Sequence, residues 1–298
     1  MLKVTIGTAP VNWNNEDVPD YRPWTPLEDM LDQMAAAGYA GTEVSAAFPP
    51  DPARIKRDLA ARGLMPASTF CAVNLREDDD ERRAVELARA EERAAYVAAL
   101  GSDVLLVADN GDERRRALAG HVGLGDALDD GAWQRLIGAC DELAARCLRH
   151  GVRVAVHNHV GTYIETEAEL RRLLDGASAD RVGLCYDVGH MLYAGGDVDD
   201  VLRLVDEYGP RLRYLHLKDV DMDVLARCHR DGLGFHDALR QGVFTEFGTG
   251  GMDFARLFAA LDRLDYQGWL IVEQDTTRRT PLQSAMHNRS YLRDRFGL

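Results

Sequence analysis

The sequence predicts a single α/β domain, a (β/α)8 TIM barrel that spans residues 1–298. Two observations predict this fold. Short β-rich runs alternate eight times with segments of helical periodicity, and no Ser/Gly-rich linker or abrupt change of composition divides the chain. An open doubly wound sheet is the structural alternative, but no GxGxxG motif follows the first strand and no GxxxxGK[ST] motif occurs in the chain.

Eight runs rich in apolar and β-branched residues are the expected strands of the barrel. Several of these runs follow a glycine, such as Gly63 or Gly151, that can end the preceding helix in the left-handed conformation. The expected strands occupy residues 4–7, 41–45, 65–70, 103–108, 152–158, 182–187, 212–218 and 269–275.

The segments between these runs are the expected helices. In the segment 130–150, apolar residues from Trp133 to Leu148 recur at spacings of three and four, and Arg and Glu fill the opposite face. The expected helices occupy residues 25–37, 52–62, 79–100, 130–150, 166–176, 197–208, 253–264 and 281–295.

Two strand-to-helix connections are longer than the plain repeat requires. Residues 109–129 follow the fourth strand, and residues 221–252 form a long insertion after the seventh. Because strand-to-helix loops of a TIM barrel lie on its catalytic face, we expect both segments to act as lids.

Charge and composition exclude several classes of partner. The chain carries 35 Lys and Arg against 49 Asp and Glu, a net charge of −14, which disfavours nucleic acid and anionic membranes. No apolar run approaches the ~20 residues of a membrane span, and the N-terminus lacks the apolar segment of a signal peptide, so we expect a cytoplasmic protein. The five cysteines form no CxxC pair, which indicates packing rather than a disulfide framework or a zinc ribbon.

Ionisable residues gather where the expected strands end. Strand two contains Glu43, and strands five to eight end in His157-Asn158-His159, Asp187-Val188-Gly189-His190, His216-Leu217-Lys218-Asp219 and Glu273-Gln274-Asp275. The carboxyl ends of parallel strands meet at one rim, and burying so many unpaired charges there is costly unless a cation neutralises them. We therefore expect a divalent metal, and the mixed nitrogen and oxygen ligands suit Mn²⁺, Co²⁺, Fe²⁺ or Zn²⁺ better than Ca²⁺. The expected metal ligands are His157, Asp187, His216 and Glu273.

Each of these residues also has a structural alternative. Asp187 can cap the next helix, and Lys218 with Asp219 can form a solvated ion pair. A single histidine at a barrel rim is often a hydrogen-bonded structural residue. The recurrence of such residues at consecutive strands is the reason to favour a metal site.

The same strand ends resemble the xylose isomerase-like barrel superfamily, which includes sugar isomerases and epimerases, inosose dehydratases and the endonuclease IV group. Within it the chain is most similar to the inosose (2-keto-myo-inositol) dehydratase family, and the resemblance covers nearly the whole chain. Further matching segments are residues 8–17, 41–43, 159–163, 242–244 and 248–250.

The resemblance implies a hydro-lyase that removes water from a polyhydroxylated cyclic ketone such as 2-keto-myo-inositol, in inositol catabolism. It also implies a divalent metal, Mn²⁺ or Co²⁺ ahead of Zn²⁺, Fe²⁺ or Mg²⁺, and a homo-oligomer, dimer or tetramer. The nearest alternative is a metal-dependent isomerase or epimerase of a ketose or keto-sugar. Such enzymes usually place a glutamate at the end of strand five as ligand and base, whereas this chain has His157 there. That departure puts a two-glutamate proton shuttle in doubt and leaves an elimination, which needs one base and one acid.

Other readings of the chain stay open or are disfavoured. A lyase of 3-keto-glycosides is a variant of the same elimination, and a non-catalytic sugar-binding barrel is a further alternative. An endonuclease is disfavoured because it would need a basic groove, which the net charge of −14 does not suggest.

Acid and base candidates lie among the same strand ends. His190 and His159 qualify because an unperturbed imidazole titrates near pH ~6.5. Lys218 lies two residues after His216 and so on the same strand face, where we expect desolvation and a nearby cation to lower its pKa. A plain electrostatic role is the alternative for Lys218, and Glu43 can be ligand, base or hydroxyl acceptor.

Substrate contacts are expected from two loops. Asn12, Trp13 and Asn14 follow the first strand, and a polar triplet with an indole suits hydroxyl groups and the apolar face of a ring. Packing within the loop is the alternative for Trp13. The expected contributors from the long insertion are Phe235, His236, Phe244 and Glu246.

Overall fold

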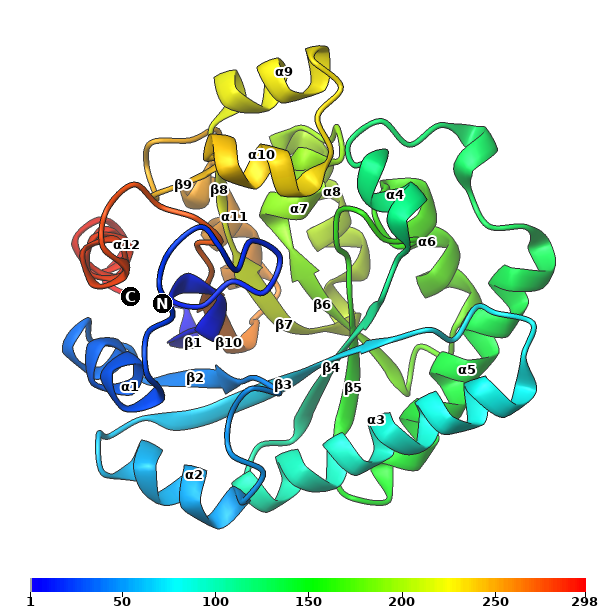
Figure 1. Ribbon diagram of the computed structural model, residues 1–298, viewed down its shortest axis with the longest axis horizontal. Coiled ribbons are helices and arrows are strands. Elements are labelled where there is room, and N and C mark those ends of the chain that lie inside the picture. The colour runs from blue at the N-terminus through cyan, green and yellow to red at the C-terminus, as the bar shows by residue number, and fades with distance from the viewer. Residues whose placement is uncertain (1) are drawn as a thin grey trace.

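Eight parallel strands close into a barrel in the computed structural model, which describes residues 2–298 (Figure 1). Around the barrel the order is β1-β2-β3-β4-β5-β6-β7-β10, so sequential strands are neighbours and the last strand closes against the first. The barrel strands are β1 (Lys3–Thr8), β2 (Gly41–Val44), β3 (Met65–Val73), β4 (Val104–Asp109), β5 (Arg153–His157), β6 (Val182–Asp187), β7 (Leu212–Leu217) and β10 (Gln267–Val272). The predicted fold class is confirmed.

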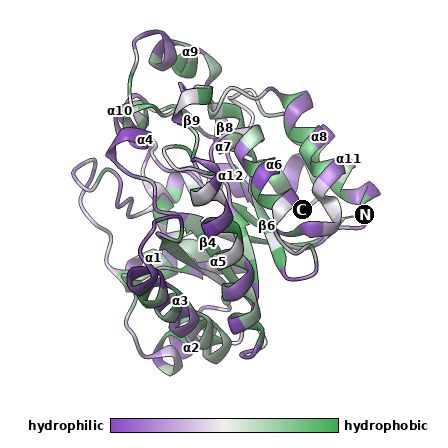
Figure 2. Cartoon of the chain, turned by 90° about the vertical axis from the view of Figure 1, so that its right-hand side faces the viewer, coloured by the Kyte–Doolittle hydropathy of each residue, from purple (hydrophilic) through white to green (hydrophobic). Residues whose placement is uncertain are grey.

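Helices follow the strands and surround the barrel, as predicted. Each of the eight expected segments contains a helix: α1 (Leu27–Ala36), α2 (Pro52–Ala60), α3 (Asp80–Leu100), α5 (Asp130–Leu148), α6 (Glu167–Gly176), α8 (Val198–Tyr208), α11 (Phe254–Arg263) and α12 (Pro281–Phe296). Figure 2 shows hydrophilic and hydrophobic residues side by side on outer helices such as α2 and α3, the pattern of helices with one face on a core. No helix of the described residues 2–298 is long and apolar enough to cross a membrane.

Short extra helices lie in the connections at the carboxyl ends of the strands. They are α4 (Glu113–Ala117) after β4, α7 (Val188–Tyr193) directly after β6, and α9 (Met222–Arg230) and α10 (Phe235–Gln241) in the long insertion. Single 3-10 turns occur at η1 (Pro10–Asn12), η2 (Leu124–Asp126) and η3 (Gly209–Arg211).

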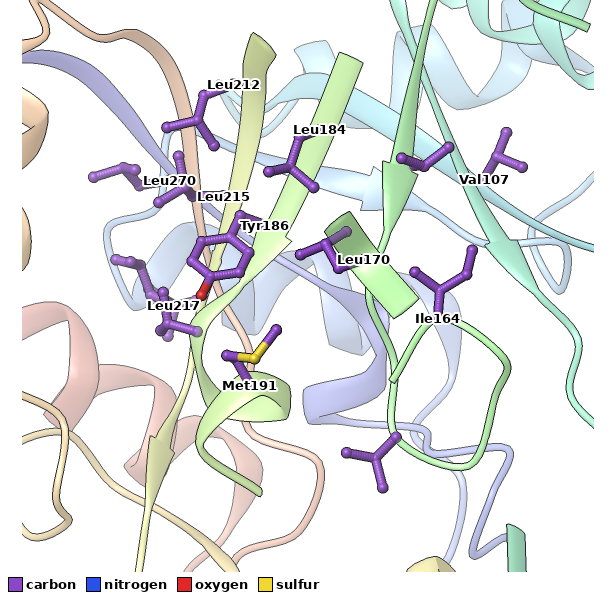
Figure 3. Close-up of a cluster of buried hydrophobic side chains, with 14 of the residues drawn as sticks. Val107, Ile164, Leu170, Leu184, Tyr186, Met191, Leu212, Leu215, Leu217 and Leu270 are labelled. Carbon is purple, nitrogen blue, oxygen red and sulfur yellow. The ribbon is translucent and has the colours of Figure 1, made fainter. Parts of the chain in front are cut away.

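Two packed layers hold the barrel together. Between the strands and the outer helices lies a large apolar cluster, part of which Figure 3 shows around Leu184 and Tyr186 of β6, Leu215 of β7 and Leu170 of α6. Inside the barrel a smaller cluster lies beneath the carboxyl-end cavity and includes Ala9, Ala67, Val104, Leu106, Ala155, Cys185, Tyr214 and Ile271. All five cysteines are free and buried, and Cys140 and Cys147, predicted to pack, belong to the apolar cluster around the barrel.

Gly41 is required by the close packing of the barrel interior. A Cβ atom at this position would lie 2.3 Å from the Met65 carbonyl oxygen and 2.7 Å from the Trp269 ring. The indole of Trp269 therefore occupies the space that a side chain on β2 would fill.

The long insertion is fixed to the barrel by a small sheet and a buried carboxylate. Strand β8 (Asp219–Val220) pairs antiparallel with β9 (Phe244–Thr245). Asp219 is fully buried and accepts hydrogen bonds from the backbone N–H groups of Gly248, Gly250 and Met252 at 3.0–3.1 Å. The alternative prediction, a solvated ion pair between Lys218 and Asp219, is therefore wrong. The Asp219 carboxylate is buried and forms its hydrogen bonds with the backbone of the insertion. Helix α10 contacts α4 and lies near it in Figure 1, so the two predicted lids lie next to each other.

Candidate active site

A cavity of about 680 Å³ opens at the carboxyl ends of the strands. The loop after β1, the ends of β2 to β5, β7 and β10, and helix α10 all contribute to its wall. The predicted site residues that line it are Asn14, Glu43, His157, His159, His216, Lys218 and Glu273.

The four predicted metal ligands lie close together, with His157 and His216 in hydrogen-bonding range and both carboxylates within 4 Å of an imidazole nitrogen. His157 Nε2 lies 3.0 Å from His216 Nδ1, and Asp187 Oδ2 lies 3.7 and 3.6 Å from these two nitrogens. Glu273 Oε2 is 3.4 Å from the same His216 Nδ1. The structure thus brings together the side chains predicted from strands five to eight.

Glu43 and Asp187 orient this cluster. Glu43 Oε1 accepts a hydrogen bond from His216 Nε2 at 2.9 Å, which fixes a proton on Nε2 and turns Nδ1 toward the other ligands. Asp187 Oδ1 caps helix α7 by accepting from the His190 backbone N–H at 2.9 Å, so the predicted capping role is real. Its second oxygen, Oδ2, is buried and has no hydrogen-bond partner among the described residues. Asp187 therefore uses one oxygen to cap the helix, and its other oxygen, 3.5 Å from Lys218 Nζ, can bind a ligand.

The cluster fits a divalent cation. Four carboxylates face the buried cavity floor, Glu43, Asp187, Glu273 and Asp275, and Lys218 is the one lysine among them. Burial alone would lower the pKa of His216, but the neighbouring Cys185 and carboxylates hold it well above its usual value. An excess of anionic groups that keeps a proton on a buried imidazole is the environment in which a metal ion is favourable.

Lys218 is a charged ammonium in this structure and not a base. Its Nζ lies 2.8 Å from Asp275 Oδ2, 3.0 Å from Glu273 Oε2 and 3.2 Å from His190 Nε2. Burial lowers the pKa of Lys218, but the carboxylates of Asp187, Asp275 and Glu273 outweigh burial and raise it well above the usual value. The expected lowering of this pKa is wrong, because three anionic side chains surround the amine.

Close packing fixes the position of Lys218. The ammonium lies 4.6 Å from the ring centroid of Phe244, and a Cβ atom at Gly189 would lie 2.5 Å from the lysine Cβ. Only glycine at the start of α7 lets the lysine stem pass.

His159 and His190 are in contact, with ring centroids 3.9 Å apart and the ring planes tilted by 42°. His159 Nδ1 donates to the Val160 carbonyl oxygen at 2.7 Å, which leaves the lone pair on Nε2, and His159 lines the cavity. His190 lies behind it, next to Lys218, and does not line the cavity. Burial lowers the pKa of both imidazoles, so both are neutral, and His159 is the one that faces the cavity.

Most of the predicted substrate contacts lie behind the cavity wall. Asn12 uses its whole amide to tie the loop to β10: it donates to Val272 O and Thr8 Oγ1 and accepts from the Gln274 N–H. Trp13 is buried and donates to Gln33 Oε1 at 2.8 Å, which is the packing role left open for it. Asn14 does line the cavity, and its amide exchanges two hydrogen bonds with the Thr25 backbone.

Of the four residues expected to line the cavity from the insertion, only two do so. Phe244 packs under Lys218, and Glu246 accepts from Thr277 Oγ1 at 2.5 Å, and neither of the two lines the cavity. Phe235 and His236 of α10 do line it, as expected.

Two acidic residues at the site were not predicted. Asp275 forms the shortest contact with Lys218 and lies two residues beyond Glu273, a spacing that places both on one side of an extended segment. Asp17 lines the cavity with its carboxylate 3.6 Å from His236 Nε2. Burial raises the pKa of Asp17, but His236, His159 and Lys218 together lower it. No sequence pattern links Asp17 to a lid residue more than 200 positions away.

A closed parallel barrel with a buried imidazole and carboxylate cluster at its carboxyl rim is the architecture of a TIM-barrel enzyme. Residues 31–295 match the family model described as "Xylose isomerase-like TIM barrel". The chain is 34% identical to an inosose dehydratase of Lacticaseibacillus casei strain BL23, over 98% of this chain and 97% of that protein. It is 32% identical to an inosose dehydratase of Geobacillus thermodenitrificans, over 99% and 98% of the two chains. The chain therefore belongs to the xylose isomerase-like TIM barrel family and, within it, to the inosose dehydratases.

Solved structures show the same fold at low sequence identity. The IolI protein with a bound zinc atom aligns with a TM-score of 0.71 at 14% identity, over 97% of each chain. A D-allulose 3-epimerase from Methylomonas in complex with D-allulose aligns with a TM-score of 0.70 at 19% identity, over 99% of this chain and 98% of the other.

Proposed function

We propose that this protein is a metal-dependent hydro-lyase that removes water from 2-keto-myo-inositol or a closely related polyhydroxylated cyclic ketone. The reaction product is a trihydroxycyclohexanedione, and no nicotinamide or flavin takes part. The inosose dehydratases to which the chain is 31–34% identical over nearly its full length support this substrate.

One observation supports an elimination: a neutral imidazole and an ammonium both line the cavity. His159 offers a free Nε2 lone pair, and Lys218 offers a cation that three carboxylates keep protonated. An elimination needs a base for the proton next to the ketone and an acid or cation for the oxygen that leaves. The end of β5 carries His157, so the glutamate that a proton shuttle between two carbons would use there is absent from that position.

In the proposed elimination, His159, Lys218 and His190 have separate roles. His159 Nε2 takes the proton from the carbon next to the ketone, and the C–O bond of the β-hydroxyl then breaks. Lys218 Nζ faces the oxygen of the leaving β-hydroxyl, on which negative charge develops, and donates a proton to it, so that the group leaves as water. The proton that His159 has taken balances the one that Lys218 gives up. The resulting enol rearranges to the dione. His190 lies in hydrogen-bonding range of Lys218 and contacts the His159 ring, and it acts as a positioning residue.

His157, Asp187, His216 and Glu273 are the residues that would hold the metal, with Glu43 orienting His216. When bound, the ion supplies a Lewis acid for the ketone and enolate oxygen. We propose Mn²⁺ or Co²⁺ as the working ion, with Zn²⁺, Fe²⁺ or Mg²⁺ as substitutes, because imidazole and carboxylate ligands suit these ions.

We further propose that the protein works in the cytoplasm, in inositol catabolism, as a dimer or tetramer. The small-molecule substrate is its ligand, and its net charge of −14 argues against nucleic acid and anionic membrane as partners.

Incubation of the metal-loaded protein with 2-keto-myo-inositol tests the proposal. We expect a product lighter by one water, with the absorbance of an enolised dione, and slower turnover when the proton next to the ketone is replaced by deuterium. A product of unchanged mass would assign the protein to the isomerases and epimerases instead. No reaction with this ketone, together with epimerisation of a ketose, would overturn the dehydratase proposal.

A further inference from the structure

Cys185 lies directly beneath the metal ligands, and the proposed reaction gives it no role. It is the residue of β6 two positions before Asp187, so both side chains point to the barrel interior. In the strand register Cys185 is the neighbour of His157 on β5 and of Tyr214 on β7. Its thiol is fully buried.

The thiol shares its surroundings with the two imidazoles. One ligand atom each from His157, Cys185 and His216 all lie within 4.8 Å of one another. A second set, Glu43, His216 and Glu273, meets the same criterion, so His216 stands between a sulfur side and an oxygen side of the centre. Hard ions favour oxygen ligands, and soft ions favour thiolate and imidazole.

We propose that Cys185 is a metal ligand, and that with His157 and His216 it gives the centre a Cys-His-His site for zinc or cobalt. This inference rests on the metal centre of the proposed function and adds to it a sulfur ligand that selects among ions. Mn²⁺ and Mg²⁺ bind on the oxygen side and leave the thiol protonated.

The distances suit this arrangement. With Zn–N near ~2.0 Å and Zn–S near ~2.3 Å, tetrahedral geometry places ligand nitrogens ~3.3 Å apart and nitrogen and sulfur ~3.6 Å apart. His157 Nε2 and His216 Nδ1 are 3.0 Å apart, and the sulfur lies within 4.8 Å of one ring nitrogen of each imidazole. Side-chain movements of about 1 Å or more close the site.

A fourth ligand is present. Asp187 Oδ2 is buried without a hydrogen-bond partner and lies 3.7 and 3.6 Å from the two imidazole nitrogens. When the ion binds, the S–H bond breaks, the Zn–S bond forms, and one proton leaves to solvent. No oxidant or reductant is needed.

X-ray absorption of the purified full-length protein, stripped of metal and then loaded with one equivalent of Zn²⁺, tests the inference. We expect one sulfur at about 2.3 Å, with nitrogen and oxygen ligands at about 2.0–2.1 Å. With Co²⁺ we expect a sulfur-to-cobalt charge-transfer band in the near ultraviolet. Cys185→Ala should remove both signals and weaken Zn²⁺ binding about tenfold or more, with Mn²⁺ binding within about twofold of wild type.

Cys71→Ala is the matched control. Cys71 is a buried cysteine on strand β3 of the same barrel, in neither of the two ligand sets, and its loss should leave both signals unchanged. If Cys185→Ala fails to fold, the wild-type absorption spectrum alone decides. A zinc shell of nitrogen and oxygen only would overturn the sulfur ligand and leave the metal centre standing. Failure of Zn²⁺, Co²⁺ and Mn²⁺ all to bind would overturn both.

Discussion

His157 Nε2 and His216 Nδ1 lie 3.0 Å apart, although 59 positions separate the two residues in the chain. Strand β6 lies between their strands, so both side chains reach across the barrel interior toward the same point. Two imidazole lone pairs cannot face each other at this distance without a proton or a cation between them. Burial lowers the pKa of His157, while the groups around His216 raise its pKa, so a proton on His216 fills this place until a metal displaces it.

His216→Ala should abolish stoichiometric metal binding, because His216 belongs to both ligand sets at the site. Glu43→Gln should weaken binding by about 10- to 100-fold, since the amide orients the imidazole less strongly than the carboxylate does. Elemental analysis after dialysis measures both effects. Tyr214→Phe is the control on the same strand: it loses only the hydroxyl that Ser68 contacts and should retain metal. Full metal content in His216→Ala would contradict the assignment.

Lys218→Met should lower kcat by roughly 10²–10⁴-fold, because the ammonium faces the oxygen on which charge develops. The variant should keep its metal, since Lys218 is not one of the ligands. Steady-state kinetics and elemental analysis on the same preparation separate the two roles. A rise in KM with unchanged kcat would show that the lysine only binds substrate.

Sequence reasoning located the strand ends because parallel strands bring their carboxyl ends to one rim, whatever the loops do. Period-two alternation placed Lys218 on the same strand face as His216, and the structure agrees, because both residues line the cavity. The charge state of Lys218 could not be predicted from the sequence, because it depends on Asp275 and Glu273, which lie within hydrogen-bonding distance of the amine in the folded barrel. Motifs predict which residues meet, but not how many charges surround each one.

Loop residues were harder to predict for a related reason. Asn12 lies in a short 3-10 turn, and its amide faces the barrel seam, where three backbone and hydroxyl partners use it completely. A polar residue after a strand has the same sequence signature whether it binds substrate or ties a loop. The difference lies in backbone direction, which local periodicity does not specify.

Gly189→Ala should impair catalysis without touching a ligand. The added methyl would lie 2.5 Å from the Cβ of Lys218, so the lysine or helix α7 must shift. We expect kcat to fall and the free energy of unfolding to drop by about 1–3 kcal/mol, with metal retained. Gly138→Ala on α5 is the matched control, because its Cβ meets nothing within 4 Å, and it should be neutral or stabilising by up to about 1 kcal/mol. Equal behaviour of the two variants would argue against the close approach.

The insertion 221–252 should become protected from protease when substrate or an analogue binds. Its helix α10 contacts the loop after β1 through Arg240 and Asp20 at 2.7 Å and through His236 and Asp17 at 3.6 Å. A ligand in the cavity adds contacts to Phe235 and His236 and so stabilises the closed arrangement. Trypsin cleavage after Arg227 and Arg230 should slow with ligand, while cleavage after the exposed Arg149 at the end of α5, which does not line the cavity, stays constant. Equal rates with and without ligand would show that the insertion is not a lid.

The last prediction concerns Glu165, which links the connection after β5 to the connection after β4. Its Oε1 accepts from the Gly120 N–H and its Oε2 from the Gly161 N–H, both at 2.7 Å. Burial raises its pKa from 4.5 to about 7, although both backbone donors and Arg115 act to lower it. The folded protein thus binds this proton more tightly than the unfolded chain does. The stabilisation is complete below about pH 4.5 and is lost as pH rises through about 7.

Urea unfolding of wild type and Glu165→Gln at pH 5 and pH 7.5 measures this effect. The glutamine does not titrate, so the difference between the two proteins isolates the carboxyl group from all other ionisable groups. From pH 5 to 7.5 we expect wild type to lose on the order of 2–3 kcal/mol relative to the variant, since one pKa unit corresponds to about 1.4 kcal/mol. At both pH values the variant also carries a fixed cost, because its amide NH₂ group meets one of the two backbone donors. A wild type that gains stability over the variant as pH rises would mean that Arg115 and the two N–H groups outweigh burial, and that Glu165 is ionised throughout.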